Sequence, residues 1–251
     1  ILRIRQTAKV ALPAFCKSLI MLMLCSTTAL AAGAESFTDW QDMGLYGGQI
    51  FCLAVDPENP ATVYTGSWGG DGLFKSTDAG LTWKTLPSDN SSRFRNCEVF
   101  DIALDPNTAT TMWVAAKQQV DVSRDRGQTW ATLTVCDNRF IYCLAVDPHD
   151  TSGATVYAGT SGPYGIEQSG ALYKTEDGGI TWQLLLIAPY DILDVIINPG
   201  QAGEVWAVSA PWSETAGCNG LVFMSPDAGV SWRSRRSAYL PDGTPHAFGY
   251  L

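Results

Sequence analysis

The sequence predicts an all-β protein, a β-propeller built from four-stranded antiparallel blades. The first observation is a motif, [Ser/Thr]-x-Asp-x-Gly-x-[Thr/Ser]-Trp, which occurs four times with its acidic residue at Asp78, Asp125, Asp177 and Asp227. The intervals of 47, 52 and 50 residues indicate an internal repeat. The second observation is a unit before each motif, in which an apolar run ends in Asp-Pro or Asn-Pro and a β-rich run follows. Four short strands per repeat are typical of propeller blades.

The motif, which we call the box, is expected to form a tight turn between two strands. The Asp bonds its own backbone two residues on, the Gly supplies a positive φ, and the Trp anchors the second strand. Because a catalytic carboxylate is not needed in every repeat, the box residues are interpreted as structural. They are Asp78, Gly80, Trp83, Asp125, Gly127, Trp130, Asp177, Gly179, Trp182, Asp227, Gly229 and Trp232.

The strands of one blade are named A to D in chain order. Strand A precedes the Asp-Pro turn, B follows it, C leads into the box, and D carries the Trp. The A–B units span residues 50–67, 99–116, 141–160 and 192–210. Pro at the turn ends strand A. The A–B turns and boxes should therefore share one face, the box face, and the B–C and D–A loops the opposite one, the loop face. A β-sandwich, the competing all-β fold, does not predict this strict four-strand period.

The ends of the sequence predict a leader and an incomplete ring. Residues 1–34 carry four basic residues and no acidic one, with an apolar run that ends in small residues, which is typical of a secretory signal peptide. A membrane anchor is the alternative. Residues 35–251 form the propeller. Residues 37–45 resemble a lone strand D, and residues 244–251 resemble the start of a fifth strand A. We therefore expect a fragment of a six- to eight-bladed ring. The alternative is a true four-bladed protein.

Composition argues against several partners. The net charge of −9 disfavours nucleic acid and anionic membranes. With two His and no Cys-x-x-Cys pair, no metal or other cofactor is expected. Cys52 and Cys143 share one position in strand A and are expected to be packed thiols. Cys97 and Cys136, both in D–A connections, are candidates for a disulfide in an oxidising compartment.

The loop face holds the candidate ligand-binding residues, because variable loops carry function. Three B–C loops place an aromatic residue near an acidic one, a pairing that suits a sugar; the alternative is that the aromatics pack their own loops. These residues are Trp68 with Asp71, Tyr164 with Glu167, and Trp212 with Glu214. In the D–A loops, Arg93, Arg95 and Arg139 are candidates for binding an anionic sugar.

Two carboxylates are candidate catalytic groups. The position four residues before the Asp/Asn-Pro turn is acidic in two blades, as Asp101 and Asp194. Paired carboxylates are what glycoside hydrolysis uses. The alternative is that the two carboxylates line a solvated channel.

The box resembles the Asp-box, or bacterial neuraminidase repeat, of propellers in sialidases, xyloglucanase-type glycoside hydrolases, sortilin and a photosystem II assembly factor. The early Arg-Ile-Pro motif and Tyr/Glu pair of sialidases are not found, which disfavours sialidase activity. The resemblance and the lack of other catalytic motifs favour a secreted or periplasmic scaffold that binds glycan or protein ligands through the loop face. The alternative is a glycoside hydrolase of xyloglucanase-like type acting on polysaccharide.

Overall fold

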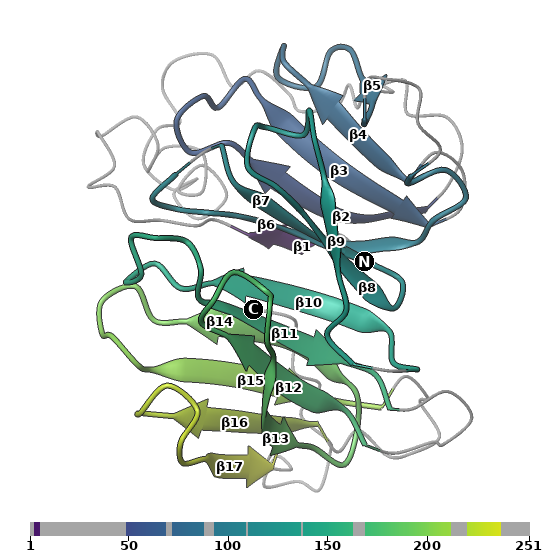
Figure 1. Cartoon of the computed structure of the whole chain (residues 1–251). Helices are drawn as coiled ribbons and strands as arrows, with labels where there is room; N and C mark the ends of the chain where they lie inside the picture. The colour runs from purple at the N-terminus through teal and green to yellow at the C-terminus, as the bar shows by residue number, and fades with distance from the viewer. Residues whose placement is uncertain are drawn as a thin grey trace, which may run out of the picture.

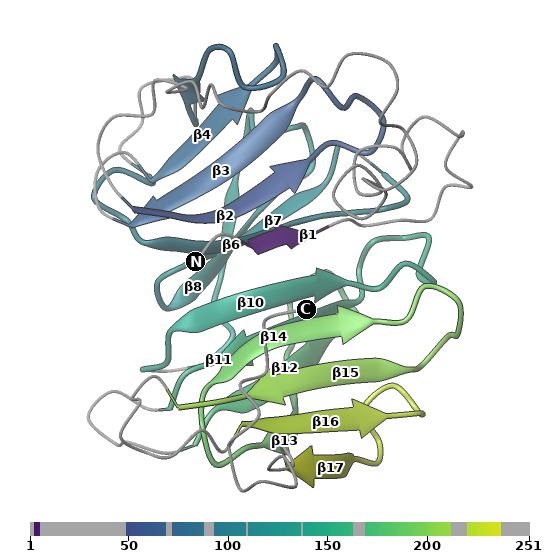
Figure 2. The ribbon, with the colours of Figure 1, turned by 180° about the vertical axis from the view of Figure 1, so that it is seen from behind.

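Four β-sheets, each with four antiparallel strands, make up the part of the protein that the structure describes. The computed structural model describes residues 3–5, 49–68, 72–87, 93–108, 110–136, 138–162, 169–211 and 220–236. Each sheet contains four strands consecutive in the chain, and the described residues contain no helix. The innermost strands of successive sheets contact one another, so the sheets fan out as blades (Figures 1 and 2). The prediction of an all-β propeller with four-stranded blades is confirmed.

The strands follow the predicted order A to D in every blade. Blade 1 comprises β2 (Gln49–Val55), β3 (Val63–Trp68), β4 (Leu73–Ser76) and β5 (Lys84–Thr85). Blade 2 comprises β6 (Val99–Leu104), β7 (Met112–Ala116), β8 (Gln119–Ser123) and β9 (Ala131–Leu133). Blade 3 comprises β10 (Ile141–Val146), β11 (Val156–Thr160), β12 (Ala171–Thr175) and β13 (Gln183–Ile187). Blade 4 comprises β14 (Ile192–Ile197), β15 (Val205–Ser209), β16 (Leu221–Ser225) and β17 (Arg233–Arg236).

One further strand joins the sheet of blade 1. Strand β1 (Arg3–Arg5) pairs in parallel with β2, on the edge of β2 that is not bonded to β3. Of residues 1–34, the structure describes only this strand. The signal peptide predicted for this segment stays a prediction. The lone strands expected at 37–45 and 244–251 lie outside the described residues.

The A–B turns have the same structure in all four blades. Asp56, Asp105, Asp147 and Asn198 each accept, through Oδ1, the backbone N–H two residues on, at 2.8–2.9 Å. Their own N–H groups donate across the turn, at 2.9–3.0 Å, to the residue that precedes strand B. This is the turn that a short Asp or Asn side chain favours.

The boxes also repeat one hydrogen-bond pattern. In blade 1 the Ser76 hydroxyl donates to Asp78 at 2.7 Å, and the Gly80 N–H donates to Ser76 Oγ at 2.8 Å. The Thr82 N–H donates to Asp78 Oδ1 at 2.8 Å. The corresponding atoms of the other boxes make the same bonds. The box Asp therefore organises the turn, but it does so through the backbone N–H four residues on, and not through the one two residues on as the sequence predicted.

Two consecutive residues of each box have positive φ. The Gly was expected to, and Gly80 has φ 91°. The residue before it also adopts the left-handed conformation, which the sequence analysis missed: Ala79, Arg126, Gly178 and Ala228 have φ of 58°, 61°, 74° and 57°. The backbone N–H of this residue donates to the A–B turn of its own blade at 2.7–3.1 Å. The boxes and A–B turns therefore lie together on the box face.

The box Gly of blades 2, 3 and 4 also forms part of a contact with the preceding blade. A Cβ on Gly127 would lie 3.0 Å from Leu86 of the preceding blade. On Gly179 or Gly229 it would overlap Leu133 or Leu185. Each of these Leu residues follows the Trp of the preceding box by three positions. The Gly is therefore required twice, for its positive φ and for the close approach of this Leu.

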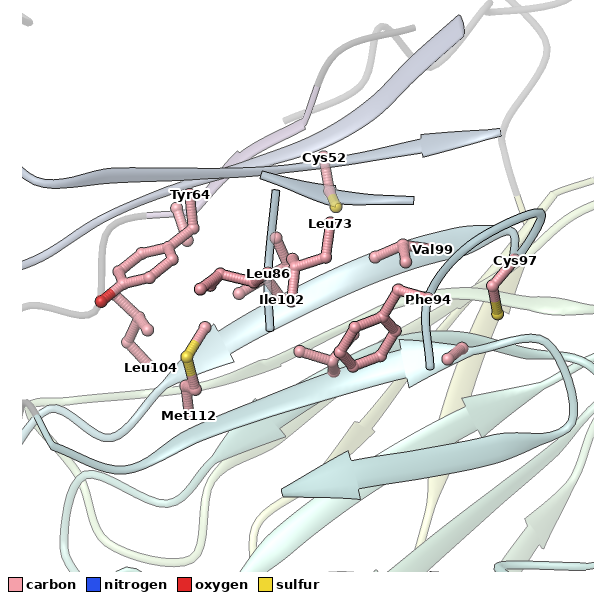
Figure 3. Close-up of a cluster of buried hydrophobic side chains, with 13 residues drawn as sticks. Cys52, Tyr64, Leu73, Leu86, Phe94, Cys97, Val99, Ile102, Leu104 and Met112 are labelled. Carbon is pink, nitrogen blue, oxygen red and sulfur yellow. The ribbon is translucent and has the colours of Figure 1, made fainter. Parts of the chain in front are cut away.

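Among the described residues, the core consists of three apolar clusters, one between each pair of adjacent blades. Between blades 1 and 2, Tyr64 and Leu73 of the first sheet face Ile102 and Met112 of the second (Figure 3). Phe94, from the D–A connection, closes one end of this cluster, and its ring lies 5.0 Å from that of Trp130. The blades are therefore held together by burial of apolar side chains between sheets.

Candidate functional site: the loop face

The B–C and D–A loops meet at the face opposite the boxes. Within blades 2 to 4, the residue after strand B donates its N–H to a residue just before strand A, as Lys117 does to Glu98 O at 3.0 Å. Between blades, Ile141 N–H donates to Lys117 O at 2.8 Å. These backbone bonds hold neighbouring loops at fixed positions along the inner strands.

Every inner strand carries a β-bulge close to the loop face. The register of strand A with strand B shifts by one residue at its second or third position in all four blades. The residue left out of the register is Phe51, Phe100, Tyr142 and Leu193 in blades 1 to 4. A bulge re-aims side chains and often lies beside a functional site. Here it brings three aromatic residues to corresponding positions in successive blades.

These aromatics form a continuous row with two others. The ring centroid of Phe51 lies 5.4 Å from that of Trp68 and 5.7 Å from that of Phe100. Phe100 is 5.1 Å from Tyr142 and 6.0 Å from Phe140. Trp68 is 50% exposed, and the other four are partly exposed. We call these five residues the aromatic row; it crosses three blades.

Two carboxylates flank the aromatic row. Glu98 accepts a hydrogen bond from Trp68 Nε1 at 3.1 Å, which fixes the indole. Asp191 accepts the Gly162 N–H at 2.8 Å. Burial, followed by the charges of Asp191 and Glu98, raises the pKa of Tyr142 to about 12, so this phenol keeps its proton. The row thus combines aromatic rings with hydrogen-bonding groups.

The structure separates the two predicted catalytic carboxylates. Asp101 is 1% exposed, and its Oδ2 accepts the N–H of Leu144, in the inner strand of blade 3, at 2.7 Å. Its carboxylate therefore lies in the interface between blades 2 and 3. Asp194, in blade 4, is partly exposed, and its Oδ1 accepts the Val195 N–H at 2.8 Å. Strand β10 contacts both β6 and β14, so blade 3 stands between the two residues. A catalytic role for either stays a prediction.

The contacts of Arg93 and Arg139, two of the predicted cationic residues, lie within the chain. Arg93 Nη1 lies 2.7 Å from the buried carboxylate of Asp121 and donates to the Thr132 hydroxyl at 2.6 Å. Arg139 donates to the carbonyls of Ser161 and Ser169, at 2.8 and 2.6 Å, at the two ends of the B–C loop. Arg95 is exposed. Arg93 and Arg139 thus position loops, which weakens the case for an anionic sugar.

Several other expectations have no structural counterpart in the described residues. Asp71, Tyr164, Glu167, Trp212 and Glu214 lie outside them. Cys97 and Cys136 are thiols, so the disulfide suggested by the sequence is not formed in this structure. In the described part of the chain, no cluster of three or more His, Cys, Asp or Glu side chains has the arrangement of a metal site. The same part contains no helix long and apolar enough to span a membrane.

Sequence reasoning found Trp68 but missed the rest of the aromatic row. Phe51, Phe100 and Tyr142 immediately precede Cys52, Asp101 and Cys143, the position on which the catalytic hypothesis was built. The signal was therefore present one residue earlier, as an aromatic residue in three of four strands A. A plain alternating strand gives no reason to expect these side chains to meet, because the bulge that brings them together depends on pairing with strand B.

The fold and its neighbours define the class of protein as a β-propeller. An ancestral GH74 enzyme superposes with a TM-score of 0.58 at 21% identity, covering 74% of this chain and 24% of that one. The structure described as YCF48 bound to D1 peptide superposes with a TM-score of 0.52 at 16% identity, covering 78% of this chain and 60% of that one. At these identities the similarity shows the fold alone.

Among curated proteins, the chain is similar to xyloglucanases. It is 24% identical over 213 residues to a xyloglucanase of Hypocrea jecorina (strain QM6a), covering 72% of this chain and 24% of that protein. It is 27% identical over 176 residues to a xyloglucanase of Paenibacillus sp., covering 58% of this chain and 17% of that protein. The chain thus spans about a quarter or less of the length of these relatives. No protein-family model matches the chain.

Proposed function

We propose that this propeller is a secreted, polysaccharide-binding protein whose ligand lies across the loop face. The observation that carries the proposal is the aromatic row, five rings from three blades on the face that bears the loops. The similarity to xyloglucanases supports a polysaccharide as the ligand.

The chemistry of the row fits a sugar polymer. Pyranose rings present apolar C–H faces that pack on the electron-rich faces of aromatic side chains. Hydroxyl groups at the ring edges would pair with Glu98, Asp191 and the Tyr142 phenol. A row that crosses successive blades offers several contact points along an extended chain, as a polymer needs. A neutral sugar fits better than an anionic one, because Arg93 and Arg139 are engaged by other groups of the chain.

Hydrolysis of the bound polysaccharide is the second candidate, because the similar curated proteins are xyloglucanases. Asp194 is the stronger of the two candidate carboxylates for contact with a substrate, since it is partly exposed whereas Asp101 is buried. In a hydrolase, Asp194→Asn would abolish the release of reducing ends from xyloglucan and leave binding nearly intact.

Binding is tested by affinity electrophoresis and calorimetry with xyloglucan. Trp68→Ala is expected to weaken binding at least about tenfold, or ~1.4 kcal/mol. The matched control is Trp206→Ala, which removes an indole that is 39% exposed on blade 4, away from the row. Equal affinities of the two variants would contradict the proposed site. A protein that binds xyloglucan and releases no reducing ends would be a scaffold and not a hydrolase.

A further inference from the structure

A cavity of about 190 Å³ lies between blades 1 and 2, beside their boxes. Blade 1 contributes Lys75 of β4, Lys84 of β5, and Thr77 and Thr82 of the box. Blade 2 contributes Arg126 and Gln128 from its own box. The cavity is therefore built by the box face and not by the loop face assigned to polysaccharide.

Its lining has an unusual charge for this protein. The chain has 25 acidic and 16 basic residues, yet the cavity is lined by three basic residues and no acidic one. The neutral polar residues at its wall are Thr77, Thr82, Thr85 and Gln128. The Thr82 hydroxyl donates to Asp78 and one amide hydrogen of Gln128 to the carbonyl of Asp125, whereas Thr77, Thr85 and the second amide hydrogen of Gln128 add further donor groups. Cations combined with neutral donors are the groups that bind oxyanions.

Lys75 is partly withdrawn from water in this cavity. Its Nζ lies 5.3 Å from the centroid of the Tyr64 ring and 3.5 Å from the carbonyl oxygen of Arg126. Burial, and then the charge of Arg126, lowers the pKa of Lys75, while the charge of Asp56 opposes this shift. Arg126 is itself 2.9 Å from Glu58, outside the lining. An anion in the cavity would therefore relieve the repulsion between two cations.

Blade 3 shows how the same position is neutralised within the chain. Lys174 corresponds to Lys75 and lies 5.5 Å from the centroid of the Tyr157 ring, as Lys75 lies over Tyr64. Two residues on, however, blade 3 has Glu176, whose carboxylate forms an ion pair with Lys174 at 2.5 Å. Blade 1 has Thr77 at that position. At the position of the Glu176 carboxylate, blade 1 therefore has a hydroxyl group.

We infer that this cavity binds an oxyanion group, such as a sulfate, phosphate or carboxylate, between Lys75, Lys84 and Arg126. Thr77 and Gln128 would donate to its remaining oxygens. This site goes beyond the proposed polysaccharide binding and lies on the opposite face. An experiment can therefore contradict one of the two proposals and leave the other intact.

The test is calorimetry on the full chain with sodium sulfate, sodium phosphate and sodium glucuronate, at an ionic strength held constant with sodium chloride. The three salts distinguish a tetrahedral oxyanion from a carboxylate. Saturable binding of at least one is expected for the natural protein. Hydrogen bonds to charged groups contribute more than neutral ones, so Lys75→Met should weaken binding about tenfold or more.

Two variants make the result specific. Thr77→Glu reproduces the internal partner of blade 3 and is expected to abolish anion binding, leaving xyloglucan binding unchanged. Lys174→Met removes the same charge from blade 3 and should keep the affinity of the natural protein. Binding that survives Thr77→Glu, or no saturable binding of any of the three anions, would overturn the inference.

Discussion

Blades 2 and 4 share one strand pattern but differ in what covers them. On one face of blade 2, Ala103 and Trp113 are 3% and 0% exposed, because blade 3 packs on them. The corresponding residues of blade 4, Ile196 and Trp206, are 48% and 39% exposed. None of the described blades packs on that face of blade 4. Whether equivalent apolar side chains are buried or exposed therefore depends on whether a neighbouring blade packs on them.

The largest expected difference between these blades concerns the two tryptophans. Trp113→Ala should lower the free energy of unfolding by about 3–5 kcal/mol, because it leaves a cavity between blades 2 and 3. Trp206→Ala should cost about 1 kcal/mol, since its indole is already partly in water and its bond to Glu204 is exposed to solvent. Urea unfolding followed by circular dichroism measures both losses. Equal losses would mean that blade 4 is covered in solution.

Trp113→Phe separates packing from hydrogen bonding in the same experiment. The buried Nε1 of Trp113 has no hydrogen-bond partner among the described residues, so replacing the indole by a phenyl group breaks no hydrogen bond in that part of the chain. The phenyl variant should therefore lose less free energy of unfolding than Trp113→Ala, because the phenyl ring keeps most of the apolar area that the alanine variant no longer buries.

The features predictable from sequence are those decided within a few residues. The Asp-Pro turn and the box depend on short-range bonds, such as Ser76 and Thr82 to Asp78, and their residues recur at the repeat period. Features that depend on a second strand or blade were not predictable. The bulge at Phe100 arises from pairing with β7, and the burial of Asp101 arises from blade 3. The candidate site was therefore located by face but not by its main residues.

The second difference concerns the corresponding carboxylates of these two blades. Asp101→Ala should cost about 1–3 kcal/mol, because the Leu144 N–H is left buried without its acceptor. Asp194→Ala should cost ~0.5 kcal/mol, since Asp194 is partly exposed and its bond to the Val195 N–H is made to the next residue of the same strand and not between blades. Denaturant unfolding of both variants gives the comparison.

Asp101→Asn serves as the control because it keeps an acceptor oxygen and should lose less stability than Asp101→Ala. Xyloglucan hydrolysis by the natural protein that disappears in Asp101→Asn, without any change in stability, would contradict a structural role for this residue. It would place Asp101 in catalysis despite its burial.

The smallest expected difference is between the boxes of the two blades, which should behave alike. Hydrogen bonds from Thr129 and Ser123 lower the pKa of Asp125 from 3.8 to about 2, and bonds from Ser231 and Ser225 lower that of Asp227. A carboxyl group whose pKa is lower in the folded state stabilises the fold above its unfolded pKa. That contribution is lost as the pH falls from about 4 toward 2. Asp125→Asn and Asp227→Asn should therefore lower the Tm at about pH 6, and the difference from the natural protein should shrink with acid.

The hydrogen bonds of the box are made within its own turn, so they do not depend on a neighbouring blade. Equal acid profiles for the two Asn variants are expected on that ground, even though the tryptophans of the same blades respond very differently. A shallower profile for Asp227→Asn would show that the box of blade 4 is less ordered in solution than that of blade 2. The contrast between the blades would then extend from the packing between sheets to the turns themselves.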